Sequence, residues 1–305
     1  STKQEQQELM NIVIVGGGAT GIEVAGILSE MKKFVLPKDY PDMPSSLMHI
    51  YLIEAGPRLL AGMSEESSAH AEQFLREMGV NILLNKRVVD YRDHKVVLED
   101  GTEIATRTFI WVSGVTGVTI GNLDASLIGR GGRIKVDSFN RVEGMNNVFA
   151  IGDQCIQLAD ENYPNGHPQL AQVAIQQGEL LAKNLVRMEK GREMKPFHYR
   201  NLGSMATVGR NRAVAEFSKV KMQGWFAWVM WLVVHLRSIL GVRNKVIVLL
   251  NWVWNYFTYD QSMRMIVYAR KAKEIRDREK VEETTHWGKE LVQEEKNPSI
   301  TSSSK

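Results

Sequence analysis

The sequence predicts an α/β protein with a parallel sheet in its first domain and helices in its last third. Three observations support this class. A β-branched run at 11–15 leads directly into closely spaced glycines, apolar strand-like runs alternate with helical segments up to residue 112, and 224–257 is rich in tryptophan. Strands that alternate with helices are typical of a parallel sheet covered by helices.

The composition is that of a folded protein. The 305 residues, 44% of them hydrophobic and 24% charged, are enough for two compact domains. A net charge of +3 gives no indication of a nucleic-acid partner. The single cysteine, Cys155, excludes an internal disulfide and a CxxC pair, and it favours a reducing compartment. The seven histidines lack the spacing of metal ligands, so we expect no metal site. Residues 1–10 are polar, and we expect the tail of a helix or the remnant of a linker there.

The opening motif predicts a dinucleotide-binding loop. Residues 11–15 form a buried parallel strand in this prediction, and the GxGxxG glycines follow at once. The first glycine allows a tight turn, the second lets the backbone approach a pyrophosphate, and the third lets a helix pack close to the strand. Glycine turns that bind nothing also occur between strands and helices. The predicted loop residues are Gly16, Gly17, Gly18 and Gly21.

An acidic residue follows the next strand. The apolar run 49–53 ends at Glu54, whose carboxylate can accept hydrogen bonds from ribose hydroxyls and would repel a 2′-phosphate. The sequence therefore favours NADH over NADPH. The separation between Gly16 and Glu54 exceeds the usual twenty or so residues, and we expect an insertion around 36–46.

The rest of this domain follows the same alternation. Ser64 caps an expected helix that continues to about residue 78, and Gly79 ends it. Further strands are expected at 80–84, 87–91, 95–98 and 108–112, with a turn at Asp100 and Gly101. Residues 11–115 are thus predicted to form a Rossmann-like domain with a β crossover in place of one helix.

A second signature, NVFAIGD, lies at 147–153. It predicts a short strand at 148–151 that ends at Gly152 and Asp153. Glycine admits a cofactor close to the backbone, and a carboxylate accepts hydrogen bonds from hydroxyl groups. A Gly-Asp turn that merely ends a strand is the alternative.

Together these motifs resemble the flavoprotein reductases in which an NAD domain is inserted into an FAD domain. The resemblance is carried by VIVGGGATGIEVAG, the β crossover, WVSGV at 111–115 and NVFAIGD. It implies that 116–205 is the second part of an FAD-binding domain, with FAD contacts at Gly152 and Asp153, and that Gly114 is also a cofactor-binding residue. The FAD domain of that family begins with a GxGxxG loop of its own, and we expect that first part to be missing from this chain.

The next motif narrows the resemblance. A helix is expected over 167–185, opened by Pro168, and its AQVAIQ string is similar to the AQxAxQ pattern of type II NADH:quinone oxidoreductases. The resemblance implies that Ala171, Gln172 and Gln176 line a quinone pocket beside the flavin ring. The two glutamines share a helix face, and uncharged amides suit quinone carbonyls. A solvated glutamine face is the alternative.

The C-terminal third favours a membrane surface. After a strand-like segment at 203–214, residues 224–257 hold five of the seven tryptophans in two apolar runs too short to span a bilayer. With Lys219 and other basic residues nearby, they predict two amphipathic helices in a membrane-associating region, 206–268. A helical hairpin in a protein core or dimer interface is the alternative. We expect 269–305 to be a charged, disordered tail.

Over residues 11 to about 268 the chain resembles type II NADH:quinone oxidoreductases. That family implies hydride transfer from NADH to FAD and two-electron reduction of a membrane quinone without proton pumping. It also implies a homodimer on the bilayer, at the cytoplasmic face of the inner (plasma) membrane. Glu23 is expected to seat the nicotinamide or to be a first-turn helix acid, and His167 to relay protons or to be a loop histidine.

Two other functions stay open. One is a flavin-dependent NADH reductase with a soluble acceptor, although a sulfide-using version would need a cysteine pair that the chain lacks. The other is a catalytically inactive, membrane-attached NAD-binding fragment. Ser113, where alanine is commoner in the family, is a mild departure from the pattern.

Overall fold

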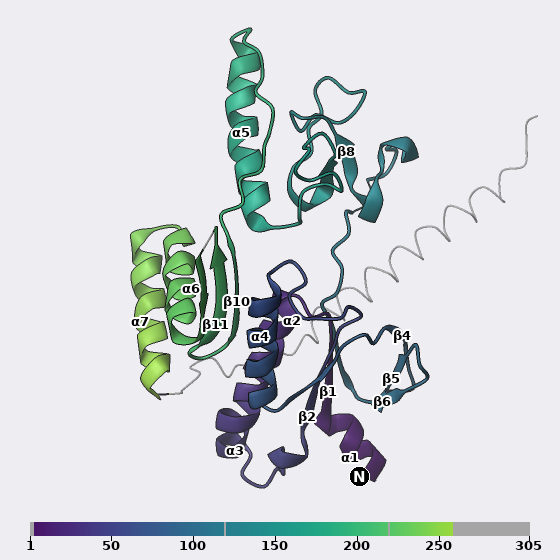
Figure 1. The fold of residues 1–305 in the computed structure, drawn as a ribbon, viewed down its shortest axis with the longest axis vertical. Helices are drawn as coiled ribbons and strands as arrows, with labels where there is room; N and C mark the ends of the chain where they lie inside the picture. Colours follow the sequence, from purple (N-terminus) through teal and green to yellow (C-terminus); the bar gives the residue numbers. More distant parts are fainter. Residues whose placement is uncertain (1–2, 119, 219, 259–305) are drawn as a thin grey trace, which may run out of the picture. The chain divides into compact units, whose positions relative to one another are not determined.

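The computed structural model describes residues 3–118, 120–218 and 220–258 (Figure 1). The predicted tail at 269–305, the end of the predicted membrane-associating region and Lys219 lie outside the described residues. The chain divides into two compact units, Ser1–Val246 and Ile247–Lys305. The fold predicted from the sequence, α/β with a Rossmann-like first domain, is confirmed.

A four-stranded parallel sheet forms the centre of the first domain. Its strands stand in the order β3-β2-β1-β7, with β1 paired on both sides. Their bounds are Asn11–Val15 for β1, His49–Ile53 for β2, Val80–Leu83 for β3 and Thr108–Trp111 for β7. Val13 and Ile14 of β1 are completely buried, because helices or strands cover both faces of a parallel sheet of this kind.

Two helices pack on this sheet. Helix α2 (Ala19–Glu30) continues through a π-helical turn, Met31–Val35, into α3 (Leu36–Asp39). Part of the expected insertion is therefore helix. The expected helix at 64–78 is confirmed as α4 (Glu65–Glu77), where the hydroxyl of Ser64 accepts a hydrogen bond from the Ser67 nitrogen at 3.4 Å.

The β crossover is a three-stranded antiparallel sheet in the order β4-β5-β6. Strands β4 (Val88–Arg92) and β5 (Lys95–Leu98) match the predicted segments, whereas β6 (Glu103–Ala105) is too short to leave a sequence signal. Residues Lys3–Met10 form helix α1, and its Glu8 makes an ion pair with Arg107 at 3.0 Å. That contact ties the first helix to the segment just before β7.

The next part of the chain corrects two predictions. The expected strand at 148–151 does not form within the described chain: Phe149 makes an isolated bridge to Arg141, while Val148 and Ile151 are 47% and 37% exposed. The strands present are β8 (Ile134–Val136) and β9 (Cys155–Gln157), which pair in parallel. Helix α5 (Ala171–Glu189) begins three residues after Pro168, since the nitrogen of Leu170 donates to the Pro168 carbonyl in a turn.

The C-terminal part begins with an antiparallel sheet. Its strands are β10 (Ser204–Gly209), β11 (Arg212–Phe217) and β12 (Val220–Gln223). On one face, Ala206, Val208 and Val214 join the core around α2. At Gly26 of α2 the approach is backbone to backbone, because an added Cβ would lie 1.7 Å from the Val208 oxygen.

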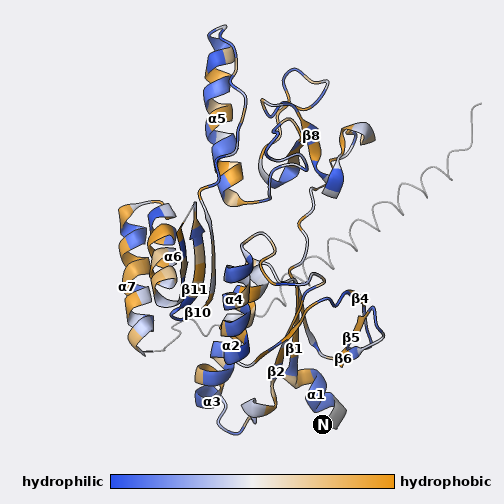
Figure 2. Ribbon diagram, viewed as in Figure 1, coloured by the Kyte–Doolittle hydropathy of each residue, from blue (hydrophilic) through white to orange (hydrophobic). Residues whose placement is uncertain are grey.

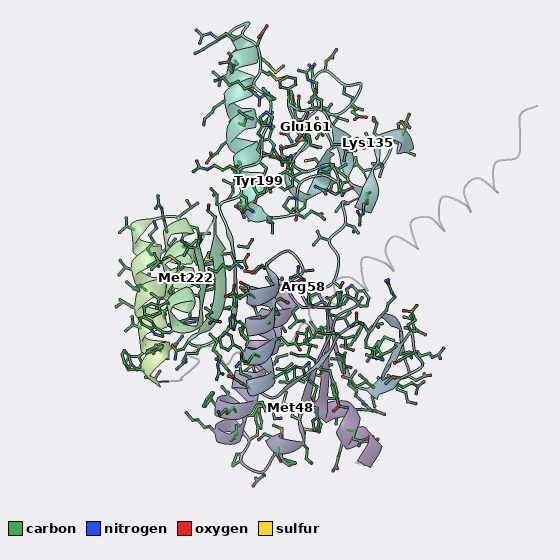
Figure 3. The ribbon with its side chains drawn as sticks, in the orientation of Figure 1. Met48, Arg58, Lys135, Glu161, Tyr199 and Met222 are labelled. Carbon is green, nitrogen blue, oxygen red and sulfur yellow. The ribbon has the colours of Figure 1, made fainter. Side chains whose placement is uncertain are left out.

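Two helices complete the described chain. On the other face of the sheet, α6 (Gly224–Ser238) buries Ala227 against Ala213 and Ala215, and Met222 packs beside them (Figure 3). Helix α7 (Val242–Thr258) follows. Both helices are coloured largely apolar in Figure 2, and Phe226 of α6 is 72% exposed. Among the described residues, no helix has the length and hydropathy needed to cross a membrane.

Candidate functional site

The glycine loop adopts the geometry that its sequence predicts. Gly16 has φ +117°, in the region that favours glycine, and its nitrogen donates to the Ile53 carbonyl at 2.9 Å. A Cβ on Gly21 would lie 1.8 Å from the Gly16 oxygen. The first glycine therefore makes the turn, and the third lets α2 pack against it.

The second glycine faces open space. Within the described part of the chain, a Cβ added to Gly18 would meet nothing within 4 Å, and Gly18, Ala19 and Thr20 are exposed. No described side chain caps the N-terminus of α2. The first-turn amides and the positive end of the helix dipole thus face outward, which fits a bound phosphate group.

Glu54 lies beside this loop and holds it. One carboxylate oxygen accepts a hydrogen bond from the Gly17 nitrogen at 2.6 Å, and the other accepts from the Gly56 nitrogen at 2.7 Å. A side chain at Gly17 would require Leu59 to shift, since an added Cβ would lie 2.7 Å from the Leu59 side chain. The carboxylate predicted to recognise ribose also fixes the conformation of the loop.

The end of β7 approaches the same loop. An added Cβ on Gly16 would lie 3.1 Å from the Cα of Ser113, so the segment that contains Gly114 flanks the glycine turn. Gly114 itself is open in the described structure, with no atom within 4 Å of an added Cβ. Its place beside the loop suits close approach of a cofactor.

The second predicted site gathers around the Gly152 turn. Gly152 has φ +65°, and an added Cβ would lie 3.2 Å from the Ala174 Cβ of α5. The Asp153 side chain is exposed, and its backbone carbonyl accepts a hydrogen bond from Gln169 at 3.2 Å. Ala171 is exposed in the first turn of α5. The structure therefore brings the predicted FAD contacts Gly152 and Asp153 close to the start of α5, where Ala171 lies.

Gln172 and Gln176 lie on one face of α5, as predicted, but both amides bind backbone. Gln172 accepts from the Leu202 nitrogen and donates to the Gly203 carbonyl, each at 3.0 Å. Gln176 accepts from the Arg200 nitrogen at 3.1 Å and donates to the Arg200 carbonyl at 2.9 Å. These two side chains fasten 200–203 to the helix.

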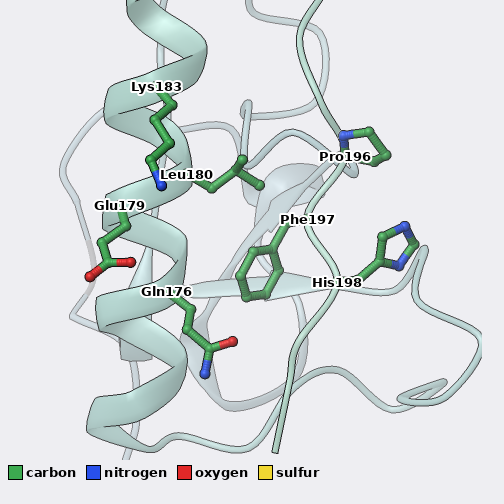
Figure 4. A pocket seen from close by; sticks show the side chains of 7 residues that line it. All are labelled: Gln176, Glu179, Leu180, Lys183, Pro196, Phe197 and His198. Carbon is green, nitrogen blue, oxygen red and sulfur yellow. The ribbon is translucent and has the colours of Figure 1, made fainter.

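An open cleft lies beside Gln176. It has a volume of about 300 Å³ between α5 and the segment that returns along it (Figure 4). Its lining residues are Gln176, Glu179, Leu180, Lys183, Pro196, Phe197 and His198. Of the predicted site residues, Gln176 lines this cleft.

Glu23 faces the C-terminal sheet. It lies beyond the first turn of α2, so the alternative of a first-turn helix acid is wrong. Its carboxylate accepts a long hydrogen bond, 3.5 Å, from the Thr207 nitrogen of β10. Burial raises the pKa of Glu23 above its usual value, and the Thr207 amide and the charge of His235 lower it by less.

His167 is a core residue. Its ring is 2% exposed, its Nε2 lies 3.0 Å from an Asp160 oxygen, and it packs against Tyr163, Phe197 and Tyr199. Burial raises the pKa of Asp160, but hydrogen bonds from His167 and from backbone amides outweigh this and hold it below its usual range. The surroundings of His167 are those of a buried structural pair, which favours neither of its two predicted roles.

Gln177 is a site residue that the sequence does not reveal. Its side chain is 1% exposed, and its oxygen accepts a hydrogen bond from the Gly152 nitrogen at 2.7 Å. Its nitrogen donates to the sulfur of Cys155 at 3.6 Å. A glutamine that follows another glutamine gives no periodic signal, because its direction depends on how the helix is rotated against its neighbours. In the described ranges, no group of three or more His, Cys, Asp or Glu could hold a metal ion.

Known proteins with similar sequences match most of the chain. Residues 1–178 match the family model described as pyridine nucleotide-disulphide oxidoreductase, and 201–259 match that of the NDH2 C-terminal domain. The type II NADH:quinone oxidoreductase NdhA of Mycobacterium tuberculosis is 34% identical over 81% of this chain and 54% of its own length. The mitochondrial internal alternative NAD(P)H-ubiquinone oxidoreductase A1 of Arabidopsis thaliana is 32% identical over 83% and 52%.

The fold has a counterpart among solved structures. NDH2 from Plasmodium falciparum, solved in complex with NADH, superposes with a TM-score of 0.76 over 85% of this chain and 68% of that one. At 19% identity this likeness shows the fold alone. The chain spans about half the length of the curated relatives it matches. These matches confirm the predicted resemblance to type II NADH:quinone oxidoreductases, and the chain belongs to the pyridine nucleotide-disulphide oxidoreductase family.

Proposed function

We propose that this chain functions in a type II NADH:quinone oxidoreductase. The reaction is hydride transfer from NADH to FAD, followed by two-electron reduction of a membrane quinone without proton pumping. The observation that carries the proposal is the uncapped, exposed N-terminus of α2 at the open Gly18, with Glu54 beside it. The names of the relatives, which couple NADH to a quinone, support the same reaction.

NADH is proposed to bind at the glycine loop. The amides at Gly18 and in the first turn of α2 bind the pyrophosphate, and Gly16 and Gly21 give the loop its shape. Glu54 keeps lone pairs for ribose hydroxyls while it holds the Gly17 and Gly56 amides. Because the loop is fixed before the ligand arrives, little conformational entropy is lost on binding.

FAD is proposed to bind at the Gly152 turn, with Ala171 close to it, and Gly114 is proposed to contact a cofactor beside the glycine loop. Bound FAD would supply the chemistry that accepts a hydride and delivers two electrons. The exposed Asp153 carboxylate accepts hydrogen bonds from cofactor hydroxyls, and Ile151 and Ile175, 37% and 60% exposed, offer apolar surface beside the turn. The donor set therefore fits the cofactor.

The quinone is proposed to meet α5 at Gln172 and Gln176. Uncharged amides bind quinone carbonyls without burying a charge. A second candidate role for the pair is to fasten 200–203, and the four hydrogen bonds to backbone favour it. The two roles differ in which reaction step a substitution slows.

Glu23 is proposed to hold a proton near the nicotinamide end. Its raised pKa extends the protonated form to higher pH than an exposed glutamate allows. A protonated carboxyl can donate a hydrogen bond to a bound ligand, whereas the ionised form can only accept.

The apolar helices are proposed to dock the protein on a bilayer as a peripheral membrane protein, at the cytoplasmic face of the inner membrane. Residues 224–257 contain arginine and lysine but neither aspartate nor glutamate. Trp225 and Phe226 of α6 are 49% and 72% exposed, as a lipid-facing surface requires. A homodimer belongs to the same proposal.

The visible absorption spectrum of the purified chain, before and after NADH, tests the proposed function. A flavin band that bleaches on addition of NADH is expected, and a quinone added next should restore it. Binding of NADH with no flavin band would favour the alternative of an NAD-binding protein without catalysis. A band that only a soluble acceptor restores would favour the soluble reductase.

A further inference from the structure

Two buried side chains hold the Gly152 turn from inside the protein: Gln177 binds the Gly152 nitrogen, and the Cys155 thiol donates to the Gly152 carbonyl at 3.5 Å. Gln177 of α5 is 1% exposed, and its oxygen accepts the hydrogen bond of the Gly152 nitrogen at 2.7 Å. The same turn carries the Asp153 carboxylate into solvent. A single buried amide thus connects the helix to the turn that presents a cofactor-binding carboxylate.

Further buried groups hold Gln177 itself. Its nitrogen donates to the sulfur of Cys155 at 3.6 Å, and Asn140 donates to the same sulfur at 3.8 Å. Arg133 donates to the Cys155 carbonyl at 2.7 Å. Cys155 and Asn140 are 1% and 2% exposed. Asn140 and Arg133 thus hold Cys155, and the Gln177 amide lies between Cys155 and the Gly152 nitrogen, with its oxygen also 3.7 Å from the Cys155 thiol.

We propose that Gln177 is a positioning residue for FAD, fixing the turn Gly152–Gln154 so that the Asp153 carboxylate faces the cofactor. The proposal rests on the proposed function, since it takes the Gly152 turn to be the flavin contact. Gln177 does not touch the cofactor. It acts through the Gly152 amide, and loss of its oxygen would leave that half-buried donor without this partner.

Helix α5 also contains a matched control. Asn184, two turns after Gln177, is likewise 1% exposed. Its side chain accepts from the Lys195 nitrogen at 2.9 Å and donates to the Lys195 carbonyl at 2.8 Å. Gln177 and Asn184 therefore resemble each other in burial and in bonding to backbone, but the bonds of Asn184 lead to Lys195 instead of to Gly152.

The test measures FAD affinity by quenching of flavin fluorescence in the wild type, Gln177→Met and Asn184→Leu. Gln177→Met keeps the volume but loses the acceptor, and we expect its Kd for FAD to rise about tenfold. Asn184→Leu should lose a similar amount of thermal stability and keep its Kd within about twofold. Amide exchange at Gly152 should accelerate in the first variant alone.

A second variant, Gln177→Glu, tests the proposal if Gln177→Met does not fold. Gln177→Glu, measured at pH 5.5, places a largely protonated carboxyl at the same position, because burial raises the pKa of such a group. It should bind FAD within about threefold of the wild type, since it retains an acceptor for Gly152. Weak FAD binding by Gln177→Glu at this pH would count against the proposal.

Three results would overturn it. An unchanged Kd in Gln177→Met would show that the turn needs no support from the helix. Equal losses in Gln177→Met and Asn184→Leu would mean that helix stability alone is measured. A wild type that binds no FAD would refute the proposed function and this inference together, and that failure is recognised before any variant is compared.

Discussion

Glu216 of β11 caps the N-terminal end of α4 through Ser64. Its carboxylate accepts hydrogen bonds from the Ser64 nitrogen, at 3.0 Å, and from the Ser64 hydroxyl. The serine that caps α4 is therefore itself bound by a strand 152 residues further along the chain. This pair joins the C-terminal sheet to the nucleotide-binding domain at a helix terminus, where a negative charge is favourable.

Replacement of Glu216 should make the stability of the protein less dependent on pH. Burial raises the pKa of Glu216, but hydrogen bonds from Ser64 and Ser67 outweigh it and hold the pKa below the usual 4.5. Its contribution is therefore complete above about pH 4.5 and is lost as the pH falls through the lowered pKa. Glu216→Gln should lower the free energy of unfolding by about 1 kcal/mol at pH 7 and by less in acid.

Urea unfolding of both proteins from pH 7 to pH 3 measures this difference. Glu189→Gln, at an exposed position at the end of α5, is the control and should follow the wild type throughout. A difference between Glu216→Gln and the wild type that stays constant over the whole range would exclude the ionic contribution.

Gly18→Val should weaken NADH binding at least about tenfold. The open space at Gly18 lets the protein fold with the new side chain, which then occupies the place of the pyrophosphate. Gly121→Val is the matched control, since among the described atoms an added Cβ there also meets nothing within 4 Å. Titration calorimetry with NADH compares the two. Equal affinities in both variants would remove the glycine loop from the cofactor site.

Gln176→Ala should slow quinone reduction about tenfold or more and leave flavin reduction by NADH unchanged. The reason is that a lost hydrogen bond to a quinone carbonyl affects the second half-reaction alone. Stopped-flow absorbance follows each half-reaction separately, with Glu189→Ala as a control on the same helix. Equal slowing of both steps would assign Gln176 to the fastening of 200–203 instead.

The double variant Phe226→Gln, Val233→Gln should bind anionic lipid vesicles at least about tenfold more weakly than the wild type. Both side chains are exposed, 72% and 56%, so their loss should leave the fold intact. Val118→Gln with Leu158→Gln is a control of nearly equal exposure, 73% and 54%, outside the helix. Co-sedimentation measures the binding of each protein to the vesicles. If the two double variants bound equally, α6 would not be the docking surface.

Local patterns predicted the parallel sheet well. The strand, glycine turn and helix around Gly16 are specified by residues next to one another, and so is the cap of α4 at Ser64. The prediction of a strand at 148–151 was wrong, and the reason is of a different kind. Its apolar letters suggested a buried strand, yet Val148 and Ile151 are exposed, and an apolar run does not distinguish a core strand from apolar surface.

The sites were predicted less completely than the fold. Gln172 and Gln176 were recognised from their string, but their partners at 200–203 depend on how a distant segment folds back on α5. The sequence did not reveal Gln177, because nothing in it distinguishes a buried glutamine from a solvated one. The domain boundaries and the roles of the site residues stay predictions.

The contact at Gly26 limits which sequences this fold allows. Only glycine lets α2 approach the Val208 carbonyl, so position 26 should tolerate substitution as poorly as the turn at Gly16. Gly16 precedes the start of α2 in the glycine loop, whereas Gly26 lies within the helix, against the C-terminal sheet. Helix α2 therefore connects the glycine loop to β10. A displacement of the loop would displace β10 as well, because no flexible side chain separates Gly26 from the Val208 carbonyl.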